Sequence, residues 1–145
     1  MENPRILVDS KNVISLIPQK YPVIMVDTLY ECSAEKAITG FTIIRENMFC
    51  ENGLFSEYGI IENIAQSAAL KAKYEEKTNI STSATCYICS IKNCAIHYLP
   101  SVGDKLMTTI SILSIVGDVA VLHGQVECDG KIVAESEMKV IFCTC

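Results

Sequence analysis

The sequence lacks the apolar segments that membrane and secreted proteins carry. No uninterrupted apolar run approaches the ~20 residues that a membrane-spanning helix needs. The segment Met1 to Ser10 has charges and a proline where a signal peptide has its apolar stretch. No internal repeat, linker or low-complexity segment divides the 145 residues. We therefore expect a single domain over residues 1-145, in the cytoplasm and with no membrane partner.

Basic residues are also scarce. The chain has 12 Lys and Arg residues against 17 Asp and Glu, which gives a net charge of −5. A general nucleic-acid-binding protein usually presents a basic face, so this balance argues against a nucleic-acid partner. An acidic carrier protein remains compatible, because a few neighbouring lysines can form a basic patch on an acidic molecule.

Disulfide bonds are not needed to stabilise a chain of this length, although it contains eight cysteines. A domain of this size buries roughly 70% of the surface that its unfolded chain exposes. Free cysteine in an apolar run behaves as a small buried hydrophobe, which is the packing expected for Cys86, Cys89, Cys94, Cys128 and Cys143. The first three have a spacing typical of metal sites, but no second pair completes a four-ligand zinc site. We expect no metal site.

Apolar runs separated by turn residues predict two helices and six strands. Asn52-Gly53, Gly117-Asp118 and Asp129-Gly130 are turn signals between them. The predicted elements are a short helix capped by Asp9 or Ser10 and ended by Pro18, strands over 21–32 and 36–44, a long helix over 56–77, and strands over 84–98, 105–116, 119–128 and 131–143.

The segment 56–77 is apolar nearly all the way round, which is typical of a helix buried on most sides. Its small residues would let a sheet approach its backbone closely: Gly59, Ala65, Ala68, Ala69 and Ala72. Runs of strands broken by one helix indicate an α+β fold rather than a parallel α/β fold. The predicted fold class is α+β, a hotdog fold in which an antiparallel sheet wraps around one long central helix.

Three motifs carry a family resemblance. Residues 16–27 (LIPQKYPVIMVD) resemble the opening of the (R)-3-hydroxyacyl-ACP dehydratases, which reads leucine-proline-histidine-arginine-x-proline, then apolar residues and aspartate. Residues 62–66 (ENIAQ) resemble the central-helix signature of that family. Residues 99–106 (LPSVGDKL) are similar to its proline-x-x-glycine-aspartate turn, which many hotdog proteins share, thioesterases included.

Two departures from the family pattern concern histidine. Residues 50–55 (CENGLF) stand where the family has its glycine-histidine-phenylalanine-proline loop, and they form a shorter loop without histidine. Gln19 stands where the opening motif has its histidine. The shortened loop resembles that of the aryl-polyene and flexirubin-type dehydratases, which usually retain the opening histidine.

The resemblance implies a site for a 3-hydroxyacyl thioester, carried by acyl carrier protein or coenzyme A, and no cofactor. Glu62 would be the catalytic acid, because desolvation against apolar walls favours its protonated form. Backbone N–H groups at the helix start would hold the thioester oxygen as it gains charge. Residues expected at the substrate are Gln19, Gly53, Leu54, Phe55 and Gln66.

Glu62 and Gln66 also have a plain structural interpretation. Glu62 can lie on a solvated helix face, and Gln66, one helical turn on, is commonly a local hydrogen-bond partner rather than a catalyst. His97 and His123, the only histidines, lie in strand-like runs away from the family's histidine positions. We expect both to be surface residues of strands.

Three functions therefore remain open. The first is a 3-hydroxyacyl-thioester dehydratase of fatty-acid or polyene-type biosynthesis, with Glu62 as acid and an atypical base. The second is a catalytically silent homologue that binds acyl carrier protein or pairs with an active dehydratase as a heteromer. The third is an acyl thioesterase, in which the helix carboxylate activates water. The resemblance also implies a homodimer, and exposed sheet edges independently support an oligomer.

Overall fold

The computed structural model describes residues 5–78 and 84–144. Its elements are α1 (Ser10–Leu16), β1 (Thr28–Cys32), β2 (Lys36–Thr42), β3 (Cys50–Glu51), β4 (Leu54–Phe55), α2 (Glu57–Thr78), β5 (Ala84–Ile96), β6 (Lys105–Val116), β7 (Val119–Cys128) and β8 (Lys131–Thr144). Asp9 caps α1, as predicted: its side chain accepts a hydrogen bond from the backbone N–H of Asn12.

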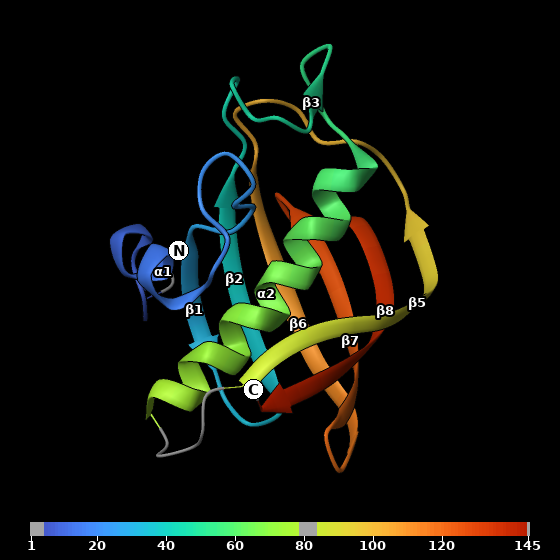
Figure 1. Ribbon diagram of the computed structural model, residues 1–145. Helices are drawn as coiled ribbons and strands as arrows, with labels where there is room; N and C mark the ends of the chain where they lie inside the picture. The colour runs from blue at the N-terminus through green and yellow to red at the C-terminus, as the bar shows by residue number, and fades with distance from the viewer. Residues whose placement is uncertain (1–4, 79–83, 145) are drawn as a thin grey trace.

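A six-stranded sheet in the order β1-β2-β6-β7-β8-β5 curls around α2, and every pair of neighbouring strands is antiparallel. Figure 1 shows α2 lying across the concave face of this sheet, with the small β3–β4 hairpin near its N-terminal end. The predicted α+β arrangement, an antiparallel sheet around one long helix, is confirmed. Within the described residues, neither helix is long and apolar enough to cross a bilayer.

The helix and sheet approach each other most closely at Gly124. Along β7 every second residue is buried, so Leu122, Gly124 and Val126 face α2 while the residues between them face outward. A Cβ atom on Gly124 would lie 2.4 Å from Cγ2 of Ile64 on α2. Glycine is therefore required on the sheet for this branched helix residue to reach its place in the core.

A row of polar side chains runs along the buried face of α2. Asn63, Ser67 and Lys71 are spaced by four residues and therefore share one side of the helix. Thr108 Oγ1 on β6 donates to Asn63 Oδ1 at 2.6 Å. The hydroxyl oxygens of Ser67 and Thr39, the latter on β2, lie 2.7 Å apart. These buried groups thus have the partners that burial in an apolar interior requires.

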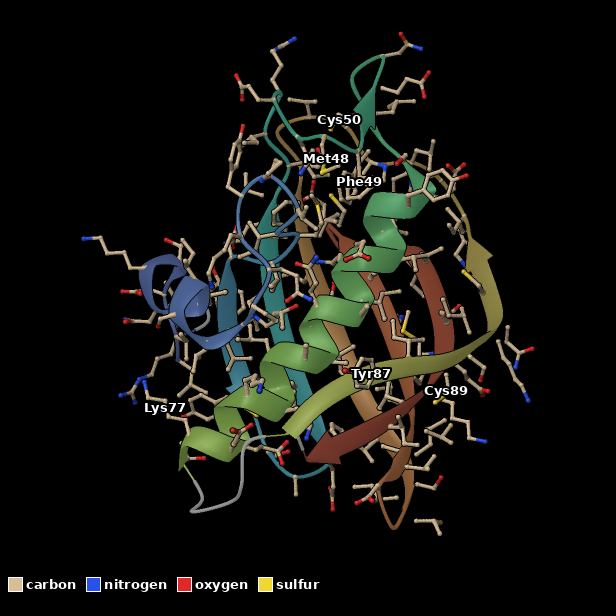
Figure 2. All side chains as sticks on the ribbon, in the orientation of Figure 1. Met48, Phe49, Cys50, Lys77, Tyr87 and Cys89 are labelled. Atoms are coloured by element: carbon tan, nitrogen blue, oxygen red, sulfur yellow. The ribbon has the colours of Figure 1, made fainter. Side chains whose placement is uncertain are left out.

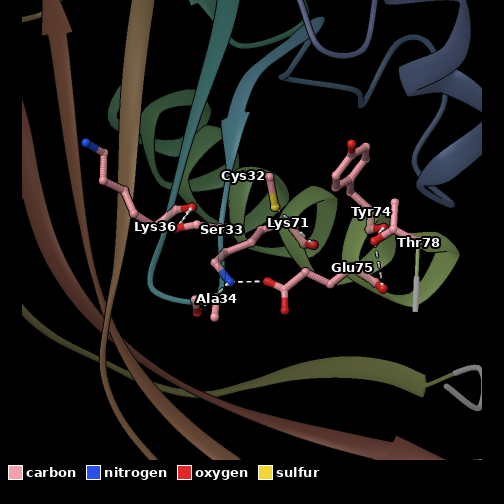
Figure 3. Close-up of polar contacts among 8 residues, drawn as sticks. All are labelled: Cys32, Ser33, Ala34, Lys36, Lys71, Tyr74, Glu75 and Thr78. Atoms are coloured by element: carbon pink, nitrogen blue, oxygen red, sulfur yellow. Dashed lines mark hydrogen bonds and ion pairs between the residues drawn. The ribbon is translucent and has the colours of Figure 1, made fainter. Parts of the chain in front are cut away.

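Lys71, only 4% exposed, ends this row. Its ammonium donates to Ala34 O at 3.1 Å, in the β1–β2 turn, and forms an ion pair with Glu75 one helical turn on (Figure 3). The buried charge is therefore paired, and the contact ties the β1–β2 hairpin to α2. The buried face of α2 is therefore partly polar, whereas the sequence predicted an apolar helix surface. Residues such as Asn63, Ser67 and Lys71 usually face solvent, so their burial was not expected.

The predicted strand over 21–32 begins later than expected, at Thr28. The backbone N–H groups of Val23 and Ile24 both donate to Lys20 O, at 2.8 and 3.0 Å, so this segment turns instead of extending. Met25 then directs both of its backbone polar groups to side chains of α2. Long-range contacts have overridden the local preference of an apolar run for strand.

The cysteines divide between core and surface. Cys128 is buried, as expected, whereas Cys89 and Cys94 on β5 are exposed, which contradicts their predicted core packing. The side chains of Cys86 and Cys143 lie outside the described residues.

Burial raises the pKa of the Cys32 and Cys128 thiols, which keeps them protonated at neutral pH. In residues 5–78 and 84–144, no three potential ligands of the His, Cys, Asp and Glu types gather to hold a metal.

Replacing Gly124 by alanine is expected to lower the free energy of unfolding by roughly 1–3 kcal/mol, because the new methyl group overlaps a buried branched side chain. Chemical denaturation measures this loss. In an Ile64→Ala background the overlapping Cγ2 is gone, so Gly124→Ala should then cost little. Strictly additive losses in this cycle would contradict the close approach of helix and sheet.

Candidate functional site

Glu62 lies in the second turn of α2 and is partly buried. One of its carboxylate oxygens, Oε2, accepts a hydrogen bond from Gln66 Nε2 at 2.8 Å, between residues one helical turn apart. The carboxylate therefore has a fixed orientation instead of moving freely in solvent. Glu62 is placed near the helix start, where the sequence predicted the site.

Gln66 connects this carboxylate to the opening motif. It is buried, and its Nε2 also donates to Val23 O at 2.9 Å. Its Oε1 accepts from the N–H of Met25 at 2.6 Å, which fixes the orientation of the amide. The expectation of a local hydrogen-bond partner therefore describes only part of its role, because Gln66 spans from Glu62 to a segment some forty residues earlier in the chain.

Asn63 is the second side chain of α2 that holds the opening segment, and the sequence analysis did not single it out for this role. Its Nδ2 donates to Met25 O at 2.7 Å, while its Oδ1 accepts from Thr108 on the sheet. Both backbone polar groups of Met25 are thus satisfied by side chains of α2, Asn63 and Gln66. The available signal was the pair of amides three residues apart, since this spacing places them on neighbouring positions of one helix face.

Gln19 lies in the turn that these amides hold. Its Oε1 is buried and has no hydrogen-bond partner among the described residues, the one such side-chain atom found there. The turn itself is well fixed, since Lys20 O accepts from two backbone N–H groups and the Lys20 ammonium donates to Ile17 O at 2.6 Å, at the end of α1. The structure thus brings Glu62 and Gln66 against the segment that follows Gln19, and no hydrogen bond among the described residues joins Gln19 to either of them.

The predicted site residues at 53–55 form the β3–β4 hairpin next to the helix start. Gly53 takes a positive φ of 79° at the turn, and Leu54 is exposed. Phe55 is fully buried, and its ring packs 5.9 Å from that of Phe41. Figure 2 shows Met48 and Phe49 in the loop that leads into this hairpin and Cys50 at the start of β3. The hairpin covers the start of α2, and its contact with substrate stays a prediction.

Both histidines lie on the outer face of the sheet. His123 alternates on β7 with Leu122 and Gly124, which face the helix. His97 Nε2 and His123 Nε2 lie 3.5 and 3.6 Å from the two carboxylate oxygens of Glu135. As expected, both lie at the surface, His123 on β7 and His97 just after the end of β5 rather than within a strand, and the sheet separates His123 from Glu62 on the inner side.

A cavity of about 300 Å³ lies at the other end of α2, against α1. Leu7, Leu16, Tyr74 and Lys77 are among the residues that line it. Glu62 does not line this cavity, which is therefore not the acyl-binding site that the resemblance implies beside Glu62.

Comparison with known families identifies the family of this chain. A family model of the ApeP-like type, described as ApeP dehydratase, matches residues 11–143. The chain belongs to the ApeP-like dehydratase family. The resemblance to 3-hydroxyacyl-ACP dehydratases drawn from the three motifs is thereby confirmed, including its similarity to the short-loop branch.

Two relatives of the chain are 3-hydroxyacyl-[acyl-carrier-protein] dehydratases named FabZ. The one from Helicobacter acinonychis is 27% identical over 149 residues, covering 97% of this chain and 94% of the relative. The one from Bacillus velezensis is 27% identical over 138 residues, covering 91% and 96%. A dehydratase-like function in 3-hydroxyacyl-ACP chemistry follows for the ApeP-like chain.

Solved structures confirm the hotdog fold. The dehydratase heterocomplex ApeI:P from Xenorhabdus doucetiae matches with a TM-score of 0.81 at 14% identity, covering 89% of each chain. A hypothetical thioesterase with coenzyme A from Streptococcus pneumoniae matches with a TM-score of 0.65 at 8% identity, covering 80% of this chain and 84% of that one. The fold therefore occurs with more than one chemistry, and function has to be argued from the site.

Gln66→Leu is expected to lower the free energy of unfolding by about 2–4 kcal/mol, because Met25 N–H and Val23 C=O lose their side-chain partner. Urea denaturation measures the change. Gln125→Leu is the matched control, since that amide lies on the outer sheet face and donates a long hydrogen bond, 3.5 Å, to Glu127 Oε1. Equal, small losses in both variants would contradict a structural link through Gln66.

Proposed function

We propose that this chain is a subunit of a 3-hydroxyacyl-thioester dehydratase that works on acyl carrier protein substrates. Glu62 is its catalytic acid, and the base is a histidine of a second, histidine-bearing dehydratase subunit. The observation that carries the proposal is the connected set of Glu62, Gln66 and the opening turn, in which the acid is held in place while Gln19 occupies the position of the base.

The reaction needs both a base and an acid. The base removes a proton from C2 of the 3-hydroxyacyl thioester, and the C3–O bond breaks with its electron pair on oxygen. Protonated Glu62 gives its proton to that oxygen, so the products are a 2-enoyl thioester and water. Charge that develops on the thioester oxygen is stabilised by N–H groups at the start of α2. The proton on the base then returns to Glu62, and the pair is restored.

The chain supplies the acid half of this pair at the site. The Gln19 amide is not basic enough to remove a proton, although it can donate and accept hydrogen bonds. His123 and His97 contact Glu135 on the outer sheet face, away from the helix. A base from another subunit would supply the missing proton acceptor. The similar Xenorhabdus structure, a dehydratase heterocomplex, supports such an assembly.

The surface offers two places for a second subunit. Strand β5 is an edge of the sheet and exposes Tyr87, Ile88 and Ile91, and unpaired strand edges readily pair with another chain. Figure 2 labels Tyr87 on this strand. At the site itself, Tyr21 and Tyr58 are each 71% exposed, on the opening turn and the first turn of α2. A site completed by another subunit explains apolar surface left open beside Glu62.

Dehydration of a 3-hydroxyacyl carrier-protein substrate tests the proposal. The chain is purified alone and with a histidine-bearing FabZ-type partner whose own helix glutamate is replaced by glutamine. We expect turnover only in the mixed complex, measured as enoyl product by mass spectrometry. Glu62→Gln in that complex should reduce turnover about 10²–10⁴-fold, the usual contribution of a general acid. Glu57→Gln, on the exposed first turn of the same helix, is the matched control.

Three outcomes would overturn the proposal. Turnover by the chain alone that equals that of the mixed complex would mean that no second subunit is required. Unchanged turnover of the Glu62→Gln complex would remove the acid from its role. Release of free thiol without enoyl product, detected with a thiol reagent, would assign the site to thioester hydrolysis.

A further inference from the structure

The cavity of about 300 Å³ at the C-terminal end of α2 takes no part in the proposed function. Its walls come from three places in the chain: the residues before α1, α1 itself and the last turn of α2. Leu7 and Val8 form the first wall, and their backbone N–H groups both donate to Leu29 O of β1 at 2.9 Å. Main-chain hydrogen bonds therefore hold this wall to the sheet.

The two helices form the other walls of the cavity. Asn12 and Leu16 of α1 lie four residues apart, as do Tyr74 and Thr78 of α2, so each pair shares one helix face. Leu16 and Tyr74 are partly buried and pack against the core. Figure 3 shows the Tyr74 ring pointing to the side of α2 on which the N-terminal part of the chain lies. All three walls are thus fixed by contacts that need no ligand.

The lining combines apolar side chains with one cation. Leu7, Val8 and Leu16 supply aliphatic surface, and no Asp or Glu is among the described residues that line the cavity. Lys77 is exposed at the end of α2 (Figure 2), and its ammonium has no ion pair or hydrogen bond to another residue in the described part of the chain. The two other lysines of α2 both pair with glutamates of the same helix. A positive charge is therefore available at the opening of the cavity.

Volume and charge together define the class of ligand that fits. A water molecule takes up about 30 Å³ of the liquid, so a cavity of 300 Å³ holds about ten non-hydrogen atoms. Apolar walls favour a hydrocarbon body, and an unpaired cation at the edge favours one anionic group. A straight-chain carboxylate of about eight carbon atoms meets both conditions.

We propose that this cavity binds the anion of a medium-chain fatty acid, with the carboxylate on Lys77 and the hydrocarbon chain against Leu7, Val8 and Leu16. Tyr74 lies three residues before Lys77, and its hydroxyl group is a second donor for the carboxylate from the same helix face. The site is distinct from that of the acyl thioester, because none of these residues belongs to the proposed acid or to the opening turn. It recognises the free acid, since an acyl thioester has no carboxylate for the ammonium.

Calorimetric titration of the purified full-length chain with octanoate and with octanamide, its neutral counterpart, tests the role of charge. We expect octanoate to bind about three- to fivefold more tightly, the contribution of one exposed ion pair. Lys77→Met should remove this preference. Lys139→Met is the matched control and should retain it, because Lys139 is exposed on β8, on the outer face of the sheet.

Charge reversal at the same position separates a loss of binding from a loss of folding. Lys77→Glu should bind octylammonium more tightly than octanoate, a change of order that an unfolded chain cannot produce. Leu7→Glu is a second variant. Its side chain is 44% exposed, so the chain should fold, and the new carboxylate should repel octanoate from the cavity. Circular dichroism checks the fold of both variants.

Methyl resonances in NMR spectra locate the bound acid. Octanoate should shift the signals of Leu7, Val8 and Leu16 and leave that of Leu54 unchanged, because Leu54 lies on the β3–β4 hairpin at the other end of α2. Shifts at Leu54 without shifts at the cavity would place the acid beside the thioester site and overturn the inference.

Three further outcomes would overturn it: no binding of octanoate at millimolar concentration, equal binding of octanoate and octanamide, or an unchanged octanoate affinity in the folded Lys77→Glu chain. None of these measurements involves turnover. The proposed function therefore stands or fails separately, on the Glu62-dependent activity of the mixed complex.

Discussion

The backbone of Met25 is the point on which the site depends. Its N–H and C=O are both satisfied by amide side chains of α2, from Gln66 and Asn63. A buried backbone group needs such a partner wherever a chain turns away from a sheet. By providing it, the helix fixes the path of the opening turn, and the same Gln66 amide then orients Glu62. One set of hydrogen bonds thus determines the local fold and the orientation of the Glu62 carboxylate.

The surrounding architecture makes this set of contacts possible. An antiparallel sheet that curls around a helix must let the two approach closely, which Gly124 allows opposite Ile64. The polar row along α2 then finds partners on the sheet, as Asn63 does with Thr108 and Ser67 with Thr39. Satisfied polar pairs inside a core fix the rotation and register of a helix more strictly than apolar packing alone.

The sequence predicted those parts of the molecule that local patterns control. Strands β6 and β7 have the predicted bounds, because apolar alternation and turn dipeptides such as Gly117-Asp118 are local signals. The turn before β1 was predicted as strand, since the groups that hold it come from Gln66 and Asn63, far away in sequence. For the site, the motif located Glu62 and Gln66 but not the contacts between them and the opening turn. Such contacts depend on tertiary packing, which no single-sequence pattern reports.

In the proposed function Glu62 is the acid, and Gln19 stands where the opening motif of the family has its histidine. Holding Glu62 against Gln66 restricts a flexible side chain, which costs conformational entropy and has to be offset by something that the orientation achieves. Core packing does not require it, because Glu62 is only partly buried. An oriented carboxyl group is suited to protonate a departing hydroxyl group, as the proposed function requires, with the proton acceptor supplied by another subunit. Tyr21 and Tyr58, both exposed, are the aromatic residues that such a subunit would cover in the proposed assembly.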